Sequence, residues 1–225
     1  MEKEIVVDVK DVSKIYESES GRTQVLDHVN VSIRKGEFVG IVGDSGSGKT
    51  TLLNMIGGLD RPTEGKVYLN DISIHDMDDE ELCVFRRENI GFVFQNYNLL
   101  PVLNVYENIV LPQKLEGCEV DKAFIEEVAD FLEIKDKLFQ MPNALSGGQQ
   151  QRVAVARALC MKPAIILADE PTGNLDSRAS RKVIELIQQL SETYNQTVVI
   201  VTHSEEIAKR ARRIIRMEDG EVLNK

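Results

Sequence analysis

Residues 43–50 read GDSGSGKT, a glycine-rich turn that ends in a lysine and a threonine. The spacing G-x-x-x-x-G-K-[ST] is typical of a phosphate-binding loop, because glycines let backbone N–H groups approach phosphate oxygens without a side chain in the way. Lys49 would place a positive charge on the terminal phosphates, and the Thr50 hydroxyl could bind Mg²⁺. The segment follows an apolar run at 37–42, so the sequence predicts a strand, this loop and then a helix whose positive end faces the phosphates.

The whole loop is expected to surround a nucleotide. Asp44 is the one residue that electrostatics disfavours beside phosphate, so its carboxylate should point away from the ligand. The predicted binding residues are Gly43, Asp44, Ser45, Gly46, Ser47, Gly48, Lys49, Thr50 and Thr51.

Polar side chains that could complete this site follow three other apolar runs. In AIILADEP, Asp169 and Glu170 end a run that must be a buried strand, and open α/β sheets bind ligands at that end of their strands. Adjacent side chains at a strand end point in different directions. Asp169 would therefore bind Mg²⁺, and Glu170 would face the attacking water as general base. Gln95 follows IGFVF and is expected to hold Mg²⁺ or the water. His203 follows TVVIVT and is expected to contact a γ-phosphate.

A second glycine turn, LSGGQQQR at 145–152, opens another predicted helix. Ser146, Gly147 and Gly148 would form an anion-binding helix N-terminus with a hydroxyl added. An ordinary helix cap needs only one Ser or Gly, so capping alone does not account for a serine followed by two glycines. Since the first loop already surrounds the phosphates, we expect this second cradle to close on the nucleotide of another copy of the chain.

Composition limits the class of protein. The chain has 225 residues, 42% apolar, and a formal charge of −10, as expected for one soluble globular domain. Nucleic acid and anionic lipid bind surfaces with clustered Lys and Arg, so the net negative charge argues against either as a direct partner.

No apolar run approaches the ~20 residues that span a bilayer, and the N-terminus lacks a signal-peptide pattern. We therefore expect a cytoplasmic protein that does not insert into the membrane. The three scattered cysteines suggest neither a disulfide framework nor a zinc site.

These residues must be positioned by a sheet and its helices. Short apolar or β-branched runs predict strands at 4–9, 29–33, 37–42, 66–74, 90–94, 164–169 and 197–202, with a polar turn at 18–24. Apolar residues at three- and four-residue spacing predict helices at 50–58, within 104–160, at 181–194 and at 204–213, before a hairpin at 214–223. Continuous apolar strands alternating with helices indicate an α/β fold with a mostly parallel sheet covered on both faces. We expect a single domain, with a core at about 1–96 and 161–225 and an inserted helical lobe at about 97–160.

Over about 5–223 the sequence resembles the nucleotide-binding subunit of ATP-binding cassette (ABC) transporters, with the motifs in the family's order. GDSGSGKT resembles the Walker A motif, AIILAD the Walker B motif and LSGGQ the signature motif. The resemblance adds an N-terminal antiparallel β subdomain to the P-loop NTPase core and helical subdomain, and implies a head-to-tail homodimer with two ATP molecules and Mg²⁺. Each ATP would lie between one Walker A motif and the partner's signature. The remaining matches are Tyr16 as the aromatic stacked on adenine, Gln95 in the Q-loop, Gln149 in the signature, Glu170 as catalytic glutamate, Gly173 to Asp176 as the D-loop and His203 as the switch histidine.

Three segments narrow the resemblance to one branch of the family. GGLDRPTEG, FVFQNYNLLPVLNVYENI and DEPTGNLDS resemble the ATPases of macrolide and antimicrobial-peptide exporters, lipoprotein-release complexes and cell-division complexes. This branch implies a bacterial subunit, peripheral on the cytoplasmic face of the plasma (inner) membrane, that drives a separate permease. The apolar segment 97–109 is the expected permease contact.

Three alternatives are open at this point. A soluble ABC-type ATPase acting on DNA or ribosomes would carry a coiled-coil insertion or two cassettes, which this chain lacks. A GTPase or small-molecule kinase would share the first loop but leave LSGGQ unexplained, and the N-K-x-D guanine motif is missing. An ATP-gated regulator of a membrane complex that transports nothing would have the same ATPase half.

Overall fold

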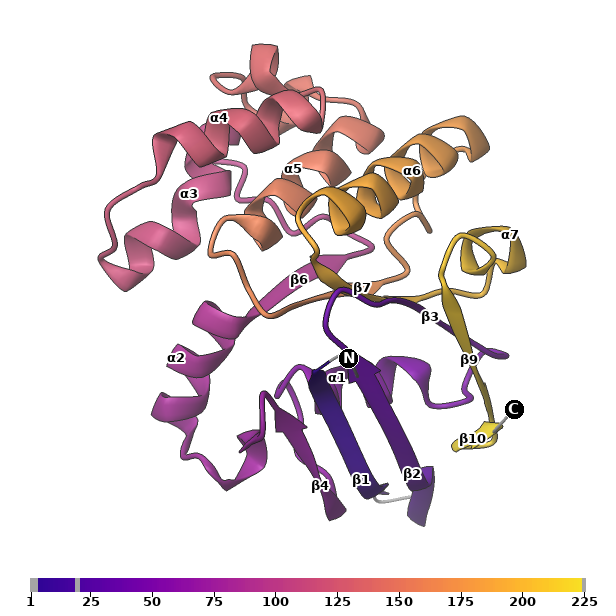
Figure 1. Cartoon of the computed structure of the whole chain (residues 1–225). Helices are drawn as coiled ribbons and strands as arrows, with labels where there is room; N and C mark the ends of the chain where they lie inside the picture. Colours follow the sequence, from indigo (N-terminus) through magenta and orange to yellow (C-terminus); the bar gives the residue numbers. More distant parts are fainter. Residues whose placement is uncertain (1–3, 19–20, 224–225) are drawn as a thin grey trace.

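The computed structural model describes residues 4–18 and 21–223, which form two sheets and the helices around them (Figure 1). The first sheet is antiparallel and has the strand order β2-β1-β4-β5. Its strands are β1 (Ile5–Ser18), β2 (Gly21–Arg34), β4 (Glu64–Leu69) and β5 (Ile72–Ser73). This sheet is the N-terminal β subdomain that the resemblance implied.

The second sheet has the order β10-β9-β3-β8-β7-β6, and only β10 is antiparallel to its neighbour. Its strands are β3 (Phe38–Val42), β6 (Ile90–Phe94), β7 (Ile165–Asp169), β8 (Thr197–Val201), β9 (Arg213–Glu218) and β10 (Glu221–Leu223). Every residue of β3 and β8 is buried, which is why these strands read as continuous apolar runs. The register pairs Phe94 with Asp169 and Asp169 with Val201, so β6, β7 and β8 end at one edge of the sheet.

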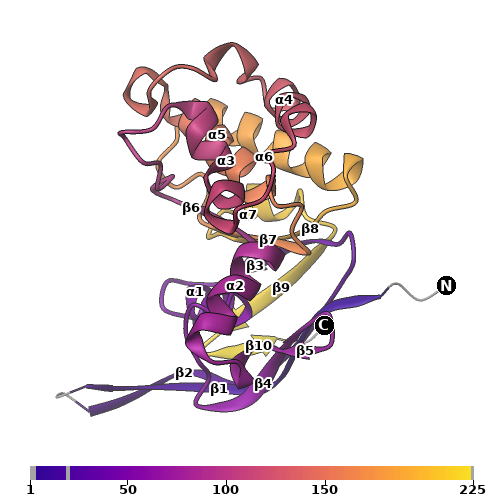
Figure 2. The ribbon, with the colours of Figure 1, turned by 90° about the vertical axis from the view of Figure 1, so that its left-hand side faces the viewer.

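Helices cover both faces of this second sheet, and side chains that alternate along its strands enter two separate cores. On one face, Leu52 and Ile56 of α1 pack between the two sheets together with Leu167 and Val199. On the other face, the helices between β6 and β7 pack with α6 over the sheet (Figure 2). The helices are α1 (Lys49–Ile56), α2 (Asp79–Asn89), α3 (Val105–Glu116), α4 (Lys122–Phe131), α5 (Gly147–Leu159), α6 (Ser177–Thr193) and α7 (Glu205–Ala208), with 3₁₀ turns at Ile74–Asp76, Lys135–Lys137 and Pro142–Ala144.

The predicted α/β fold with an inserted helical subdomain is therefore confirmed, while the boundaries near 97 and 160 stay a prediction. Four predicted elements differ from the structure. The strands expected at 4–9 and 29–33 are parts of the longer β1 and β2. The strand expected at 66–74 ends at Leu69, because the chain turns through Asn70 and Asp71 at positive φ. The helix expected at 204–213 is only the four-residue α7, since β9 begins at Arg213.

The polar turn expected at 18–24 includes residues 19–20, which lie outside the described residues, and β2 already begins at Gly21. The helix α2 was not predicted at all. Among the described residues, no helix combines the length and apolar character needed to cross a membrane.

Candidate functional site

The loop between β3 and α1 forms a cradle around the Lys49 ammonium. Gly48 caps α1 with φ 95°, and a Cβ there would lie 2.6 Å from the Val25 carbonyl oxygen, so both conformation and space require glycine. The Lys49 Nζ donates to the Asp44 carbonyl oxygen at 2.5 Å and to Ser47 Oγ at 3.3 Å. Lys49 is only 8% exposed. The loop therefore holds one cation at its centre, beside the N-terminus of a helix.

Two oxygen ligands meet next to this loop. The Thr50 hydroxyl, at the start of α1, donates to Asp169 Oδ1 at 3.1 Å, at the end of β7. Burial raises the pKa of the Asp169 carboxyl, and the neighbouring Glu170 charge adds to the effect. A divalent cation would offset this cost, and hydroxyl and carboxylate oxygens are ligands that Mg²⁺ accepts. The pair therefore fits the predicted magnesium anchor.

Glu170 turns away from Asp169 toward the end of β8. Its φ of 44° places it in the left-handed region, and its Oε1 accepts the His203 backbone N–H at 3.0 Å. The same oxygen lies 2.8 Å from His203 Nδ1. The Glu170 side chain is 21% exposed and that of His203 74%.

A cavity of about 300 Å³ joins these groups. Within one chain the structure thus brings the first loop, Glu170 and His203 together, as the sequence predicted. The lining residues are Val25, Ser45, Gly46, Gly48, Lys49, Thr50, Thr51, Glu170, Val201 and His203.

Gln95 lies at the same sheet edge, but its amide is turned toward the loop after β7. Its Nε2 donates to Asn174 Oδ1 at 3.0 Å. The Asn174 amide in turn donates to the Gln95 carbonyl oxygen at 3.2 Å and to Asn96 Oδ1 at 2.8 Å. Gln95 does not line the cavity beside Lys49, and no hydrogen bond among the described residues joins it to Thr50 or Asp169. The sequence motifs single out Asn174 only as part of the D-loop match and do not predict these hydrogen bonds.

Tyr16 belongs to β1 and stands at 40% exposure. Its hydroxyl donates to Asp60 Oδ2 at 2.7 Å, and the Lys14 ammonium lies 4.8 Å from the centre of its ring. Burial and the Asp60 carboxylate raise the pKa of the phenol, while the Thr51 side chain opposes this through a hydrogen bond. Tyr16 does not line the cavity beside Lys49, and its predicted stacking on adenine stays a prediction.

The second glycine turn lies elsewhere in the chain. Ser146 caps α5, with Gln149 N donating to Ser146 Oγ at 3.3 Å and Ser146 N donating to Gln149 Oε1 at 2.8 Å. A Cβ on Gly147 would lie 2.8 Å from the Tyr97 hydroxyl and 3.1 Å from Leu175, so this glycine permits a close approach. None of the signature residues lines the cavity beside Lys49. The two predicted cradles are thus separate within one chain.

Asp176 also lies outside that cavity. It caps α6, because its Oδ1 accepts the backbone N–H groups of Arg178 and Ala179, both at 2.9 Å. These two bonds lower the pKa of the Asp176 carboxyl. Its predicted contact with nucleotide stays a prediction.

Comparison with known proteins decides the family. The family model described as ABC transporter matches residues 26–173. The chain belongs to the ABC transporter family. It is 47% identical, over 96% of its own length and 95% of the relative's, to the uncharacterized ABC transporter ATP-binding protein MJ0796 of Methanocaldococcus jannaschii. It is 42% identical to the macrolide export ATP-binding/permease protein MacB of Bdellovibrio bacteriovorus, over 96% of this chain but only 33% of MacB.

Solved ABC cassettes have the same fold. The dimeric structure of MJ0796 superposes with a TM-score of 0.87 at 46% identity, covering 97% of each chain. A second MJ0796 structure, a dimer in a post-hydrolysis state bound to ADP and phosphate, gives the same TM-score and coverage. The ABC chain described here is accordingly an ATP-binding cassette and an ATPase.

Proposed function

We propose that this cassette closes on ATP as a homodimer and so drives a separate membrane permease of the macrolide-exporter or lipoprotein-release type. The observation that carries the proposal is the separation of two intact anion cradles within one chain. The loop around Lys49 and the turn at Ser146 cannot share one phosphate in a single copy. The dimeric MJ0796 structures and the cassette–permease architecture named for MacB support the same assembly.

The loop residues bind and orient the phosphates. Backbone N–H groups of the glycine turn and the Lys49 ammonium would hold the β- and γ-phosphates, and Tyr16 would stack on the adenine. Thr50 and Asp169 would hold Mg²⁺, and the Gln95 Oε1 would join them while its Nε2 stays bonded to Asn174. When bound, Mg²⁺ neutralises charge on the phosphate oxygens.

Glu170 would act as the general base. Its carboxylate takes a proton from water as the water oxygen bonds to the γ-phosphorus, and the bond from phosphorus to the bridging oxygen breaks toward ADP. The His203 backbone N–H and ring hold the carboxylate in place, so the base is positioned before substrate arrives. The signature serine and glycines of the second copy would complete the γ-phosphate shell. Loss of the γ-phosphate then removes the link between the subunits.

The permease would dock in an apolar groove of about 370 Å³ beside the Q-loop. The sequence predicts this contact at 97–109, whereas the groove includes only Asn98 of that segment. Leu115, one of the lining residues, is 67% exposed, as suits an apolar contact with a partner. The groove is lined by Arg87, Ile90, Gly91, Phe92, Phe94, Asn98, Leu111, Pro112, Leu115, Arg157, Ala158 and Met161. Docking there would hold the cassette at the cytoplasmic face of the membrane.

Co-purification tests the proposal. The tagged Glu170→Gln variant, trapped with ATP in its native cells, should bring down a membrane permease after gentle solubilisation. Lys49→Ala, which cannot hold the phosphates, is the matched control and should bring down less of it. Recovery of a nuclease or ribosomes without any membrane protein would refute the transport role, and recovery of a membrane hydrolase or sensor would indicate a regulator instead.

A further inference from the structure

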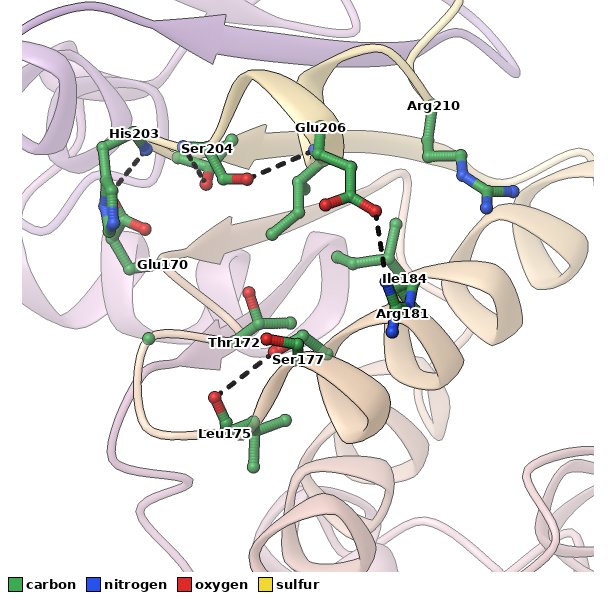
Figure 3. Close-up of a pocket in the computed structure, with 14 residues that line it drawn as sticks. Glu170, Thr172, Leu175, Ser177, Arg181, Ile184, His203, Ser204, Glu206 and Arg210 are labelled. Carbon is green, nitrogen blue, oxygen red and sulfur yellow. Dashed lines mark hydrogen bonds and ion pairs between the residues drawn. The ribbon is translucent and has the colours of Figure 1, made fainter.

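A second cavity, of about 250 Å³, lies behind the Glu170 and His203 pair (Figure 3). Its walls are the loop after β7, the first turns of α6 and the segment that runs from the end of β8 through α7 to Arg210. The volume is far above the roughly 10–15 Å³ that one water needs. It can therefore hold a solvated polyatomic ion.

Glu170 and His203 are the residues that line both this cavity and the nucleotide cavity. The contact of 2.8 Å between Glu170 Oε1 and His203 Nδ1 forms part of the wall between the two spaces. The His203 backbone N–H donates to the same oxygen at 3.0 Å, so it is the imidazole that would turn away to widen the connection between the two spaces. The 74% exposure of the His203 side chain leaves it free to change rotamer.

The interior of the second cavity offers an unused hydrogen-bond donor. Thr172 is only 7% exposed, and its hydroxyl points toward the middle of the cavity (Figure 3). Among residues 4–18 and 21–223, no hydrogen bond to this hydroxyl is present, and its oxygen is not one of the buried polar atoms without a partner, so it faces the open space of the cavity. Ser177 and Ser204 add further hydroxyls to the lining. Such a hydroxyl can donate to a ligand that accepts hydrogen bonds and enters the cavity in place of water.

The charges are arranged from negative to positive along the cavity. Glu170 stands at the wall shared with the nucleotide, and Arg181 and Arg210 stand at the far end. Glu206 also lies there, 3.8 Å from Arg181, but both side chains are exposed and such pairs open readily in water. Arg210 forms no ion pair with any residue that the structure describes. An anion leaving Glu170 would move from a repelling carboxylate toward two guanidinium groups.

We propose that this cavity receives the inorganic phosphate produced by hydrolysis and is its route of release. The inference rests on the roles proposed above for Glu170 and His203. The nucleotide cavity holds ADP on one side, and in a closed dimer the second copy covers the other. Movement of His203 away from Glu170 opens the shared wall, Thr172 donates to the phosphate, and Arg210 attracts it to the surface.

Direct binding is tested first with inorganic phosphate as the probe. The protein is saturated with ADP to fill the loop at 43–51, and phosphate is titrated against backbone ¹H–¹⁵N spectra at constant ionic strength. Resonances of Thr172, Ser177 and Arg210 should shift in a saturable manner. Arg210→Gln should weaken this binding about three- to tenfold, as for loss of one charged partner at a partly solvated site. Lys209→Gln removes an equal charge from the neighbouring residue, which does not line the cavity, and should leave it unchanged.

Kinetics then separates bond cleavage from release. Rapid quench measures cleavage of ATP, and a fluorescent phosphate sensor measures free phosphate. In Thr172→Val and Arg210→Gln, cleavage in a single turnover should keep the wild-type rate while phosphate appears several-fold more slowly. Lys209→Gln should match the wild type in both measurements.

Two results would overturn the inference. Phosphate that perturbs only the loop at 43–51, or nothing, would show that the cavity is no phosphate site. Release that follows cleavage equally in all variants would show that it is no route. If either result is obtained while Glu170→Gln abolishes hydrolysis, the proposed function stands and only the release route is wrong. If Glu170→Gln continues to hydrolyse ATP, neither the proposed function nor the release route has its basis.

Discussion

The divergence of Asp169 and Glu170 is the residue-scale feature on which the chemistry depends. Asp169 faces Thr50, whereas Glu170, at φ 44°, faces His203. The alternation of side chains at a strand end let the sequence predict this division of roles. The sequence could not predict the positive φ of Glu170. This conformation costs on the order of 1–3 kcal/mol for a residue other than glycine. The hydrogen bond from the His203 backbone N–H helps to stabilise it here.

Replacing Glu170 by Gln tests the general-base role. Gln keeps the size and one acceptor oxygen but cannot take a proton from water, so turnover should fall by about 10²–10⁴-fold. ATP affinity should change little, since Glu170 is not part of the phosphate loop. Steady-state phosphate release and equilibrium binding of ATP measure the two effects. Hydrolysis within tenfold of the wild type would rule out Glu170 as the base.

Asn174 is expected to position Gln95. It both donates to and accepts from the segment at 95–96, which neither Ala nor Asp can do. Asn174→Ala should therefore lower kcat about tenfold while KM for ATP stays within about twofold, as for an interaction that matters in the transition state.

A double-mutant cycle distinguishes positioning from general destabilisation. If Asn174 acts through Gln95, adding Asn174→Ala to Gln95→Ala should cost almost nothing further. Gln189→Ala, an exposed amide on α6, is the control and should retain full activity. Additive losses in the double variant would mean that Asn174 acts independently of Gln95.

At the element scale, strands with an unbroken apolar run and a constant pairing register could be predicted accurately, and irregular strands could not. The buried strands β3, β7 and β8 were predicted within one residue, because both faces are covered and the apolar run is unbroken. β1 and β2 were cut short because their pairing shifts register, with Asp11 and His28 at positive φ. Each irregularity interrupts the period of two on which a strand prediction depends.

The helix α2 was missed even though its start signal is present in the sequence. Asp78 accepts the N–H groups of Glu80 and Glu81, and the Glu81 side chain accepts the Asp78 N–H at 3.1 Å. This is a capping box, recognisable from an Asp followed three residues later by Glu. Only Leu82 of α2 is buried, so the apolar periodicity that predicts helices is nearly absent there.

Removing this cap should destabilise the cassette measurably. Asp78→Ala leaves two N–H groups of α2 without their acceptor and should lower the free energy of unfolding by about 1 kcal/mol. Urea denaturation followed by circular dichroism measures the change. Glu88→Ala, on an exposed position of the same helix, is the control and should stay within ~0.5 kcal/mol. Equal effects of the two variants would mean that the cap is not what stabilises α2.

At the scale of the whole molecule, the motifs predicted residues that line the cavity beside Lys49, but they did not predict how that cavity is connected to its surroundings. Residue type and spacing sufficed for the loop at 43–51, since each position has its own chemical reason. The link between Gln95 and Asn174 joins residues 79 positions apart, and no local pattern reports such a contact. The second cavity likewise exists only because α6 and α7 meet behind Glu170.

The separation of the Lys49 loop from the Ser146 turn is the property that requires a second copy. Ser146 lies at the start of α5 in the helical subdomain, outside the cavity that contains Lys49. Ser146→Arg would place a bulky cation where the γ-phosphate of the second copy should sit, without touching the loop that binds nucleotide in the same chain.

Sedimentation equilibrium of Glu170→Gln, with and without Mg²⁺ and ATP, tests this claim most directly. The 25.3 kDa chain should be monomeric without ATP and dimeric with it. Glu170→Gln with Ser146→Arg should bind ATP and stay monomeric. An ATP-bound Glu170→Gln monomer, or a double variant that dimerises as well as Glu170→Gln, would contradict closure of the signature on the other subunit's nucleotide.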